Sequence, residues 1–297
     1  MTTPAPAVAI PRWRAGLHSV GRLVGQVWTS WNDDYASSMG AALAYYTLFS
    51  LAPLLLIVIS VAGLVFGEAA ARGEIQAQLD ALMGQRGAAA VQDLLASVHQ
   101  PRMGLAATLL GVALLVVGAT SVFAELQDAL DRIWRVPTQA RDNSWLRLLR
   151  SRLLSYGVIL ALGFLLTVSL VASAVLAALG RKLDPLLGSW NTIVETINAA
   201  SSFVLAAVVF ALIFKVMPRV QVQWKDVWIG ALFTAALFAL GKLLIGLYIG
   251  RSAVASGFGA AGSLVVVLLW VYWSAQILMI GAEFTWVWAN QFGSRRP

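Results

Sequence analysis

Three ionisable residues lie inside long apolar stretches of the chain: Glu195, Lys242 and Glu283. An ionisable group in such a stretch is costly to bury and tends to have a function, such as binding an ion, a proton or a substrate. Lys242 could hold an anionic group, and Glu195 could balance its charge. Because Glu195, Asn198 and Ser202 are spaced by three and then four residues, they share one face of a helix. We therefore expect a polar notch beside Lys242.

Six apolar stretches position these residues, and each reaches the ~20 residues that a helix needs to cross the hydrocarbon core of a membrane. They comprise residues 39–66, 104–123, 155–179, 193–214, 227–249 and 261–288. Apolar residue types make up 59% of the 297 residues before the 25 glycines are counted, whereas ~45–50% is usual with glycine included. The sequence predicts an all-α polytopic membrane protein with six transmembrane helices and excludes soluble enzymes, fibrous proteins and disordered chains.

The basic residues behind the net charge of +7 are distributed as expected for a membrane protein, with no need for a nucleic-acid site. Four segments on one side of the six stretches hold 14 Lys and Arg, and three segments on the other side hold 6. The richer set comprises residues 1–38, 124–154, 215–226 and 289–297. Because basic residues gather on the cytoplasmic face, both termini are expected there. Three regions follow: a cytoplasmic N-terminal segment 1–38, a transmembrane domain 39–289 and a cytoplasmic tail 290–297. Membrane lipids are the expected partners.

Amphipathic segments outside the six stretches predict interfacial helices. In the N-terminal segment, apolar residues at steps of three and four form one stripe: Trp13, Leu17, Val20, Val24, Val27 and Trp31. The linker 67–103 contains two amphipathic pieces around Leu79 and Leu95, separated by residues Gly84 to Gly87. Beyond the second stretch, two pairs spaced by four residues are expected to form ion pairs within a helix. These pairs are Asp128 with Arg132 and Asp131 with Arg135.

Lys242 and Glu283 are predicted to lie at different depths in the membrane. At ~1.5 Å per residue, Lys242 lies about 12 Å below the outer end of its stretch, and Glu283 lies about 33 Å along its own. The two are therefore not expected to pair. Glu283 falls near the cytoplasmic boundary, where an arginine from residues 124–154 or interfacial water could neutralise it. For Lys242, the alternative is that its long side chain reaches the outer headgroups and has no further role.

Several motifs resemble the YihY/BrkB family of bacterial inner-membrane proteins. The opening motif is Asp34-Tyr35 followed by AALAYYTLFSLAP at 41–53, and the closing motifs are FGAAGS at 258–263, LWVY at 269–272 and GAEF at 281–284. Gly118-Ala119 before residues 123–135 is similar to the middle of the family, so the resemblance covers roughly residues 20–290. It implies a six-helix inner-membrane protein, with lipid or envelope-component transport among the associated functions. Phe258 stands where the family pattern has tyrosine.

Five residues are candidates for a structural or gating role. Pro53 lies within the first stretch and should kink it. The resemblance adds four residues of the opening and closing motifs: Tyr45, Tyr46, Gly259 and Gly262.

The family has also carried the label ribonuclease BN, which requires a test of the enzyme hypothesis. Metal-dependent hydrolysis needs a cluster of histidine and carboxylate ligands. The two histidines, His18 and His99, are predicted on opposite sides of the membrane and cannot share a metal. The local carboxylates fit roles that need no metal: Asp33 and Asp34 suit a helix N-terminus, and those of 125–131 have arginine neighbours. No catalytic residue, metal site, cofactor or nucleic-acid partner is therefore expected.

The predicted function is transport or translocation of an amphipathic or anionic substrate, such as a lipid or an envelope precursor. The alternative is a non-transporting structural or partner-binding membrane protein of the cell envelope. An ion channel is disfavoured because the sequence contains no ring of like residues and no filter loop. The sequence is compatible with a homo-oligomer and does not identify the substrate or the energy source.

Overall fold

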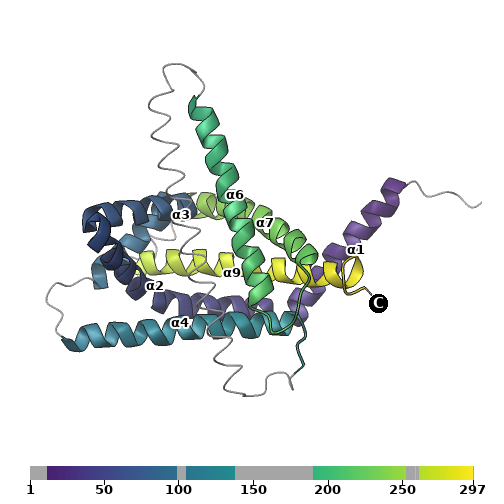
Figure 1. The fold of residues 1–297 in the computed structure, drawn as a ribbon, viewed down its shortest axis with the longest axis horizontal. Helices are drawn as coiled ribbons and strands as arrows, with labels where there is room; N and C mark the ends of the chain where they lie inside the picture. The colour runs from purple at the N-terminus through teal and green to yellow at the C-terminus, as the bar shows by residue number, and fades with distance from the viewer. Residues whose placement is uncertain (1–11, 99–104, 138–189, 252–257, 259–260, 297) are drawn as a thin grey trace, which may run out of the picture.

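The structure is a computed structural model that describes residues 12–98, 105–137, 190–251, 258 and 261–296. Within these ranges, every regular element is an α-helix (Figure 1). The helices are α1 (Arg12–Asp33), α2 (Ala36–Phe66), α3 (Glu68–Val98), α4 (Leu105–Ile133), α6 (Trp190–Val216), α7 (Trp224–Arg251) and α9 (Gly262–Gln291). The all-α prediction is confirmed for this part of the chain, and the predicted span at 155–179 lies outside it.

Four of these helices are long and apolar enough to cross a membrane. The candidate spans are Ala36–Leu56, Ala199–Val216, Trp224–Tyr248 and Gly262–Gln291. They coincide with the first, fourth, fifth and sixth predicted stretches, and the second predicted stretch falls within α4. A protein with several membrane-spanning helices is thus supported, and the complete set of six stays a prediction.

Helix α9 lies at the centre of the described bundle and packs against α1, α2, α3, α4 and α7 (Figure 1). It can occupy this place because small residues such as Gly281, Ala282 and Ala289 are fully enclosed and allow neighbouring helices to approach. One apolar core joins α2, α4, α6, α7 and α9 around Leu130 and Phe214. A second core, around Leu95 and Val267, joins α3 to the other half of α2, α7 and α9.

Two glycines set the contact between α7 and α9. Gly230 of α7 lies against the side chain of Thr285, and Gly281 of α9 lies against that of Thr234. Each threonine hydroxyl donates a hydrogen bond to the carbonyl four residues earlier in its own helix, Thr234 to Gly230 and Thr285 to Gly281. Both hydroxyls are therefore satisfied although both side chains are fully buried. The result is a reciprocal glycine–threonine contact with no room for another carbon atom on either glycine.

The linker after the first span forms α3, which consists of two helical pieces. They meet at Gly84, whose φ of 74° and ψ of 166° are non-helical. A positive φ of this kind is readily adopted by glycine, which has no Cβ. The prediction of two pieces separated near Gly84 is confirmed, with Leu95 of the second piece buried against the bundle.

Helix α1 packs against α9 through two buried residues, one of which belongs to the predicted apolar stripe. Leu23 and Val27 are buried and contact Val287 of α9, whereas Val24 and Trp28 are exposed. Val27 belongs to the predicted stripe and Leu23 does not, and the placement of this stripe at the membrane interface stays a prediction. The exposed Val24 and Trp28 suit contact with a membrane interface.

Candidate functional site

Lys242 lies on α7, one helical turn beyond a cluster of three aromatic rings. Phe238 contacts Phe210 of α6 with ring centroids 5.8 Å apart and Trp270 of α9 with centroids 6.3 Å apart. Because residues four apart share a helix face, Lys242 is on the same side of α7 as Phe238. Its side chain is partly buried. A cationic group thus follows an aromatic cluster where α6, α7 and α9 meet.

The aromatic cluster contains a buried polar atom that the sequence pattern did not indicate. The indole nitrogen Nε1 of Trp270 is buried and has no hydrogen-bond partner among the described residues. An indole N–H can only donate, so an unpaired one in an apolar setting favours an acceptor such as an anionic oxygen. Trp270 belongs to the LWVY motif, but nothing in that motif predicted that its N–H would be enclosed.

The other predicted notch residues lie on α6, whose N-terminal part extends away from α7 and α9 (Figure 1). Ser202 is exposed, and the buried residues of this helix begin at Ala207. The side chains of Glu195 and Asn198 lie outside the described residues, although both positions belong to α6. Contact between Lys242 and these three side chains therefore stays a prediction.

Glu283 is a fully buried carboxyl on α9, and neither of its oxygens has a hydrogen-bond partner among the described residues. Its neighbour is the side chain of Asp34, at the turn between α1 and α2. Asp34 itself is half-buried, and its Oδ2 is enclosed without a partner. The turn that presents Asp34 is fixed by Tyr35, which has a positive φ of 56°. Glu283 was predicted as a site residue from the sequence, whereas its pairing with Asp34 was not.

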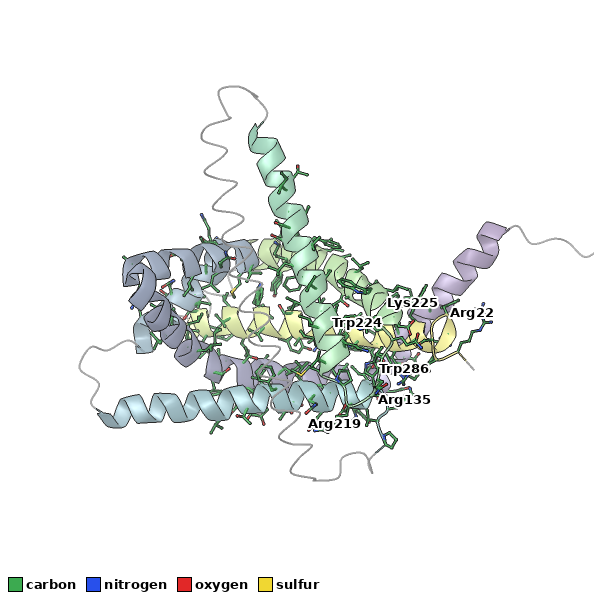
Figure 2. The ribbon with its side chains drawn as sticks, in the orientation of Figure 1. Arg22, Arg135, Arg219, Trp224, Lys225 and Trp286 are labelled. Carbon is green, nitrogen blue, oxygen red and sulfur yellow. The ribbon has the colours of Figure 1, made fainter. Side chains whose placement is uncertain are left out.

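Arg135, just beyond α4, supplies positive charge near this carboxyl pair. Its guanidinium lies 4.2 Å from the ring centroid of Trp286, one turn beyond Glu283 on α9, and its charge acts on Glu283. Of the two possibilities given by the sequence, an arginine from 124–154 or interfacial water, Arg135 fits the first. Figure 2 shows that Arg135 and Trp286 belong to one end of the bundle, where Arg219, Trp224 and Lys225 also gather.

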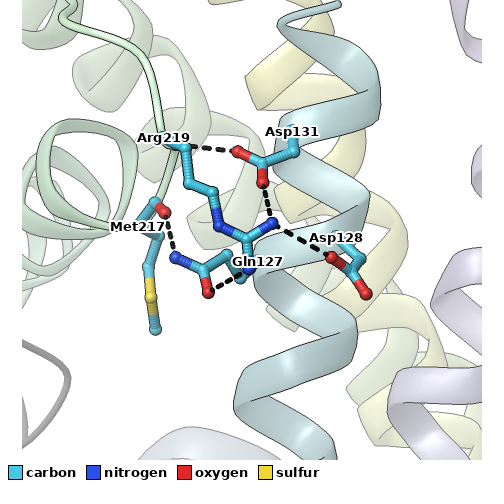
Figure 3. Close-up of polar contacts among 5 residues, drawn as sticks. All are labelled: Gln127, Asp128, Asp131, Met217 and Arg219. Atoms are coloured by element: carbon cyan, nitrogen blue, oxygen red, sulfur yellow. Dashed lines mark hydrogen bonds and ion pairs between the residues drawn. The ribbon is translucent and has the colours of Figure 1, made fainter. Parts of the chain in front are cut away.

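A second polar cluster joins α4 to the loop between α6 and α7 (Figure 3). Asp131 is buried and accepts hydrogen bonds from the backbone N–H of Arg219 at 2.7 Å and from its guanidinium at 2.9 Å. Asp128 lies 3.6 Å from the same guanidinium. Gln127 accepts from Arg219 and donates to the carbonyl of Met217. Every member of the cluster thus has a partner.

The predicted ion pairs within α4 give way to contacts with other elements. Asp128 and Asp131 bind Arg219, whereas Arg132 lies over the ring of Tyr35 and Arg135 over that of Trp286. The i to i+4 spacing identified residues that carry charge on one helix, but it could not identify partners that the fold brings from other elements.

The structural and gating candidates occupy different places. Tyr45 is exposed on α2 and packs edge-on against Phe49, with Tyr46 half-buried beside it. Pro53 falls inside the unbroken helix α2. Gly262 is buried at the first position of α9. Gly259 lies outside the described residues.

The hypothesis of a metal-dependent ribonuclease gains no support from this geometry. In the described part of the chain, no group of three or more His, Cys, Asp or Glu side chains could hold a metal ion. The carboxylates of the acidic segment on α4, Asp128 and Asp131, are occupied by Arg219. These two carboxylates join α4 to the loop between α6 and α7.

Comparison with known proteins finds relatives that are named UPF0761 membrane proteins. The chain is 29% identical over 254 residues to a UPF0761 membrane protein of Pseudomonas paraeruginosa, covering 84% of this chain and 58% of the relative. It is 31% identical over 258 residues to a UPF0761 membrane protein of Halorhodospira halophila, covering 85% and 54%. A UPF0761 membrane protein of Cronobacter sakazakii is 27% identical over 268 residues, with 87% and 86% covered.

The chain therefore spans little more than half the length of several of the relatives that it matches. No solved structure matches it. A family model described as "Virulence factor BrkB" matches residues 27–297, which include the opening and closing motifs as well as Asp34, Lys242 and Glu283. The resemblance found in the sequence is confirmed: the chain is a membrane protein that belongs to the BrkB virulence factor family.

Proposed function

We propose that this protein translocates an amphipathic, anionic substrate, such as a lipid or an envelope precursor, across the bacterial inner membrane. The observation that carries the proposal is Lys242, the one charged residue between positions 227 and 249 of α7, one turn from the aromatic cluster around Phe238. An ammonium and the buried N–H of Trp270 complement the oxygens of a phosphate or carboxylate headgroup. Ionisable groups at such depth commonly mark a substrate or ion pathway.

The aromatic cluster beside Lys242 supports an amphipathic substrate rather than a small anion. Phe210, Phe238 and Trp270 form an apolar surface one helical turn from Lys242. The exposed leucines of α7, by contrast, lie on the opposite face of the helix, where they suit contact with membrane lipids. A substrate with both a charged and an apolar part would contact Lys242 and the aromatic cluster at once.

Replacing Lys242 with methionine is expected to slow translocation while leaving the fold intact. Methionine keeps the length and removes the charge, and the loss of one charge-assisted contact of about 1.5–3 kcal/mol corresponds to a rate lower by about tenfold to a hundredfold. The measurement is movement of a fluorescent anionic phospholipid between the leaflets of reconstituted vesicles. Lys225→Met is the matched control, because Lys225 is an exposed lysine at the start of the same helix.

Two results would contradict this proposal in different ways. If Lys242→Met protein reconstitutes in normal amount and moves the lipid as fast as the wild type, Lys242 does not bind the substrate. If the wild-type protein moves neither anionic phospholipids nor envelope lipid precursors, translocation itself is wrong. A non-transporting role would then be favoured, and the exposed Val24 and Trp28 of α1 are the surface on which a partner could dock.

The proposed orientation places both chain termini and the loop between α6 and α7 in the cytoplasm. The gathering of Arg22, Arg135, Arg219 and Lys225 at one end of the bundle supports it (Figure 2), because basic residues favour the cytoplasmic face. The kink of α3 at Gly84 would then face the opposite compartment.

Cysteine labelling of intact cells tests the orientation directly. The chain contains no cysteine, so a single introduced thiol is the only labelling site. A membrane-impermeant maleimide is expected to label Gln85→Cys, which is exposed next to Gly84, and to label Asn32→Cys only after the inner membrane is opened. Labelling with the reverse dependence would show that the orientation is inverted.

A further inference from the structure

Glu283 and Asp34 are neighbouring carboxyl groups at the end of the bundle opposite the α3 kink. If both were ionised, neither could donate a hydrogen bond to the other. Both oxygens of Glu283 and the Oδ2 of Asp34 are enclosed without hydrogen-bond partners among the described residues, although the two side chains are neighbours. Ionised carboxylates only accept hydrogen bonds and repel each other. A single proton between them turns one group into a donor and removes one of the two negative charges. Pairs of this kind are known to share a proton.

The charges around Glu283 leave the carboxyl pair incompletely neutralised. The groups that act on it are Asp34 and Asp33 from the α1–α2 turn and Arg135 from the end of α4. The helices α2 and α7, which also pack against α9, contribute no charged side chain between 36 and 66 or between 227 and 241. Arg135, which acts on Glu283, therefore meets three carboxyl groups, and its guanidinium is already stacked on Trp286. A second arginine, Arg132, lies over the ring of Tyr35, the residue next to Asp34.

The two carboxyls differ in their access to water. Glu283 is fully buried, Asp34 is half-buried, and Asp33 is exposed beside it. A proton can therefore reach Glu283 from bulk water through Asp34, which has one enclosed oxygen and belongs to a turn at the surface. A half-buried carboxyl beside a fully buried one can pass a proton between water and the interior, and chains of acidic residues form the proton relays of pumps and transporters.

We propose that Asp34 and Glu283 form a proton-binding site that holds one shared proton and exchanges it with the water on its own side of the membrane. The positive charge of Arg135, which lies over Trp286, stabilises the one negative charge that remains on the pair. The site is separate from Lys242 and the aromatic cluster, so it stands whether or not the protein moves lipids. In a transporter, such a site would be the group that couples movement to a proton gradient.

Infrared difference spectroscopy of the purified full-length protein in lipid nanodiscs tests this site. A protonated carboxyl has a C=O stretching band that an ionised carboxylate lacks. We expect this band in the wild type at neutral pH, its loss in Glu283→Gln, and its disappearance from the wild type as the pH is raised. Asp34→Asn should shift the band, because the hydrogen-bond partner of Glu283 changes. Asp33→Asn, which alters the exposed neighbour, should leave the band in place.

The proposal is overturned if the Glu283→Gln and wild-type spectra coincide in the carboxyl region at neutral pH, because Glu283 would then be ionised and paired with Arg135. Glu283→Gln is expected to fold, since glutamine keeps the shape of the side chain and its amide can donate to Asp34. If this variant nevertheless fails to fold, Asp34→Asn decides the question. An unshifted band in Asp34→Asn shows that the two carboxyls do not share a proton.

Discussion

Replacing Gly281 with alanine is expected to destabilise the protein by about 1–3 kcal/mol, the usual range for an added methyl group in a packed core. The new Cβ would meet the side chain of Thr234 well inside van der Waals contact. Thr234 cannot easily move away, because it is fully buried and its hydroxyl is bonded to the carbonyl of Gly230. The measurement is thermal or denaturant unfolding of the purified protein in detergent, followed by intrinsic fluorescence.

Two controls separate this collision from a general effect of alanine. Gly246→Ala lies on α7 at a position where a Cβ meets nothing within 4 Å, so it should be neutral or stabilising, as expected when a helical glycine is replaced by alanine. Combining Gly281→Ala with Thr234→Ala should restore part of the lost stability, because the colliding atoms are removed. Combining it with Thr285→Ala should restore none, because Thr285 lies against Gly230. Equal effects of the two threonine changes would contradict the reciprocal contact.

The sequence predicted the helices well but predicted the faces through which they pack only in part. The apolar stretches were long enough to give the candidate spans in α2, α6, α7 and α9. On α7, three alanines are spaced by four residues, and Ala231 and Ala235 are buried whereas Ala239 is exposed. In a helix of 3.6 residues per turn, residues four apart point in directions that differ by about 40°. After two such steps, the side chain points away from a neighbouring helix that runs straight alongside.

The sequence identified the candidate site residues that stand out within a single helix, but it did not identify contacts between helices. The lone charges Lys242 and Glu283 could be found because each interrupts an apolar stretch. The Asp34–Glu283 pair could not be predicted, because it depends on how the α1–α2 turn packs against α9, far along the chain. For the same reason, the local pattern around Asp34 indicates only a charge at a helix N-terminus. The N–H of Trp270 was missed because its burial depends on packing against other helices, which the sequence around Trp270 does not indicate.

The Arg219 cluster is another contact that local spacing could not predict, and its loss should be costly. Replacing Arg219 with alanine is expected to destabilise the protein by about 3 kcal/mol, the lower end of the range for breaking a buried ion pair. The carboxylate of Asp131 would remain buried after losing the guanidinium that now neutralises it. The loop between α6 and α7 would also lose its side-chain contacts with Gln127 and Asp128 on α4.

The size of the effect should depend on which partner is removed. Asp128→Asn is expected to change stability by less than about 1 kcal/mol, because Asp128 is exposed and lies 3.6 Å from the guanidinium. Asp131→Asn should fall between the two variants: Arg219 is partly exposed and can be hydrated, and the asparagine oxygen can still accept the backbone N–H of Arg219. Unfolding of the three variants under one set of detergent conditions gives the order. If Asp128→Asn costs as much as Arg219→Ala, burial of the Asp131 carboxylate is not what makes Arg219 necessary.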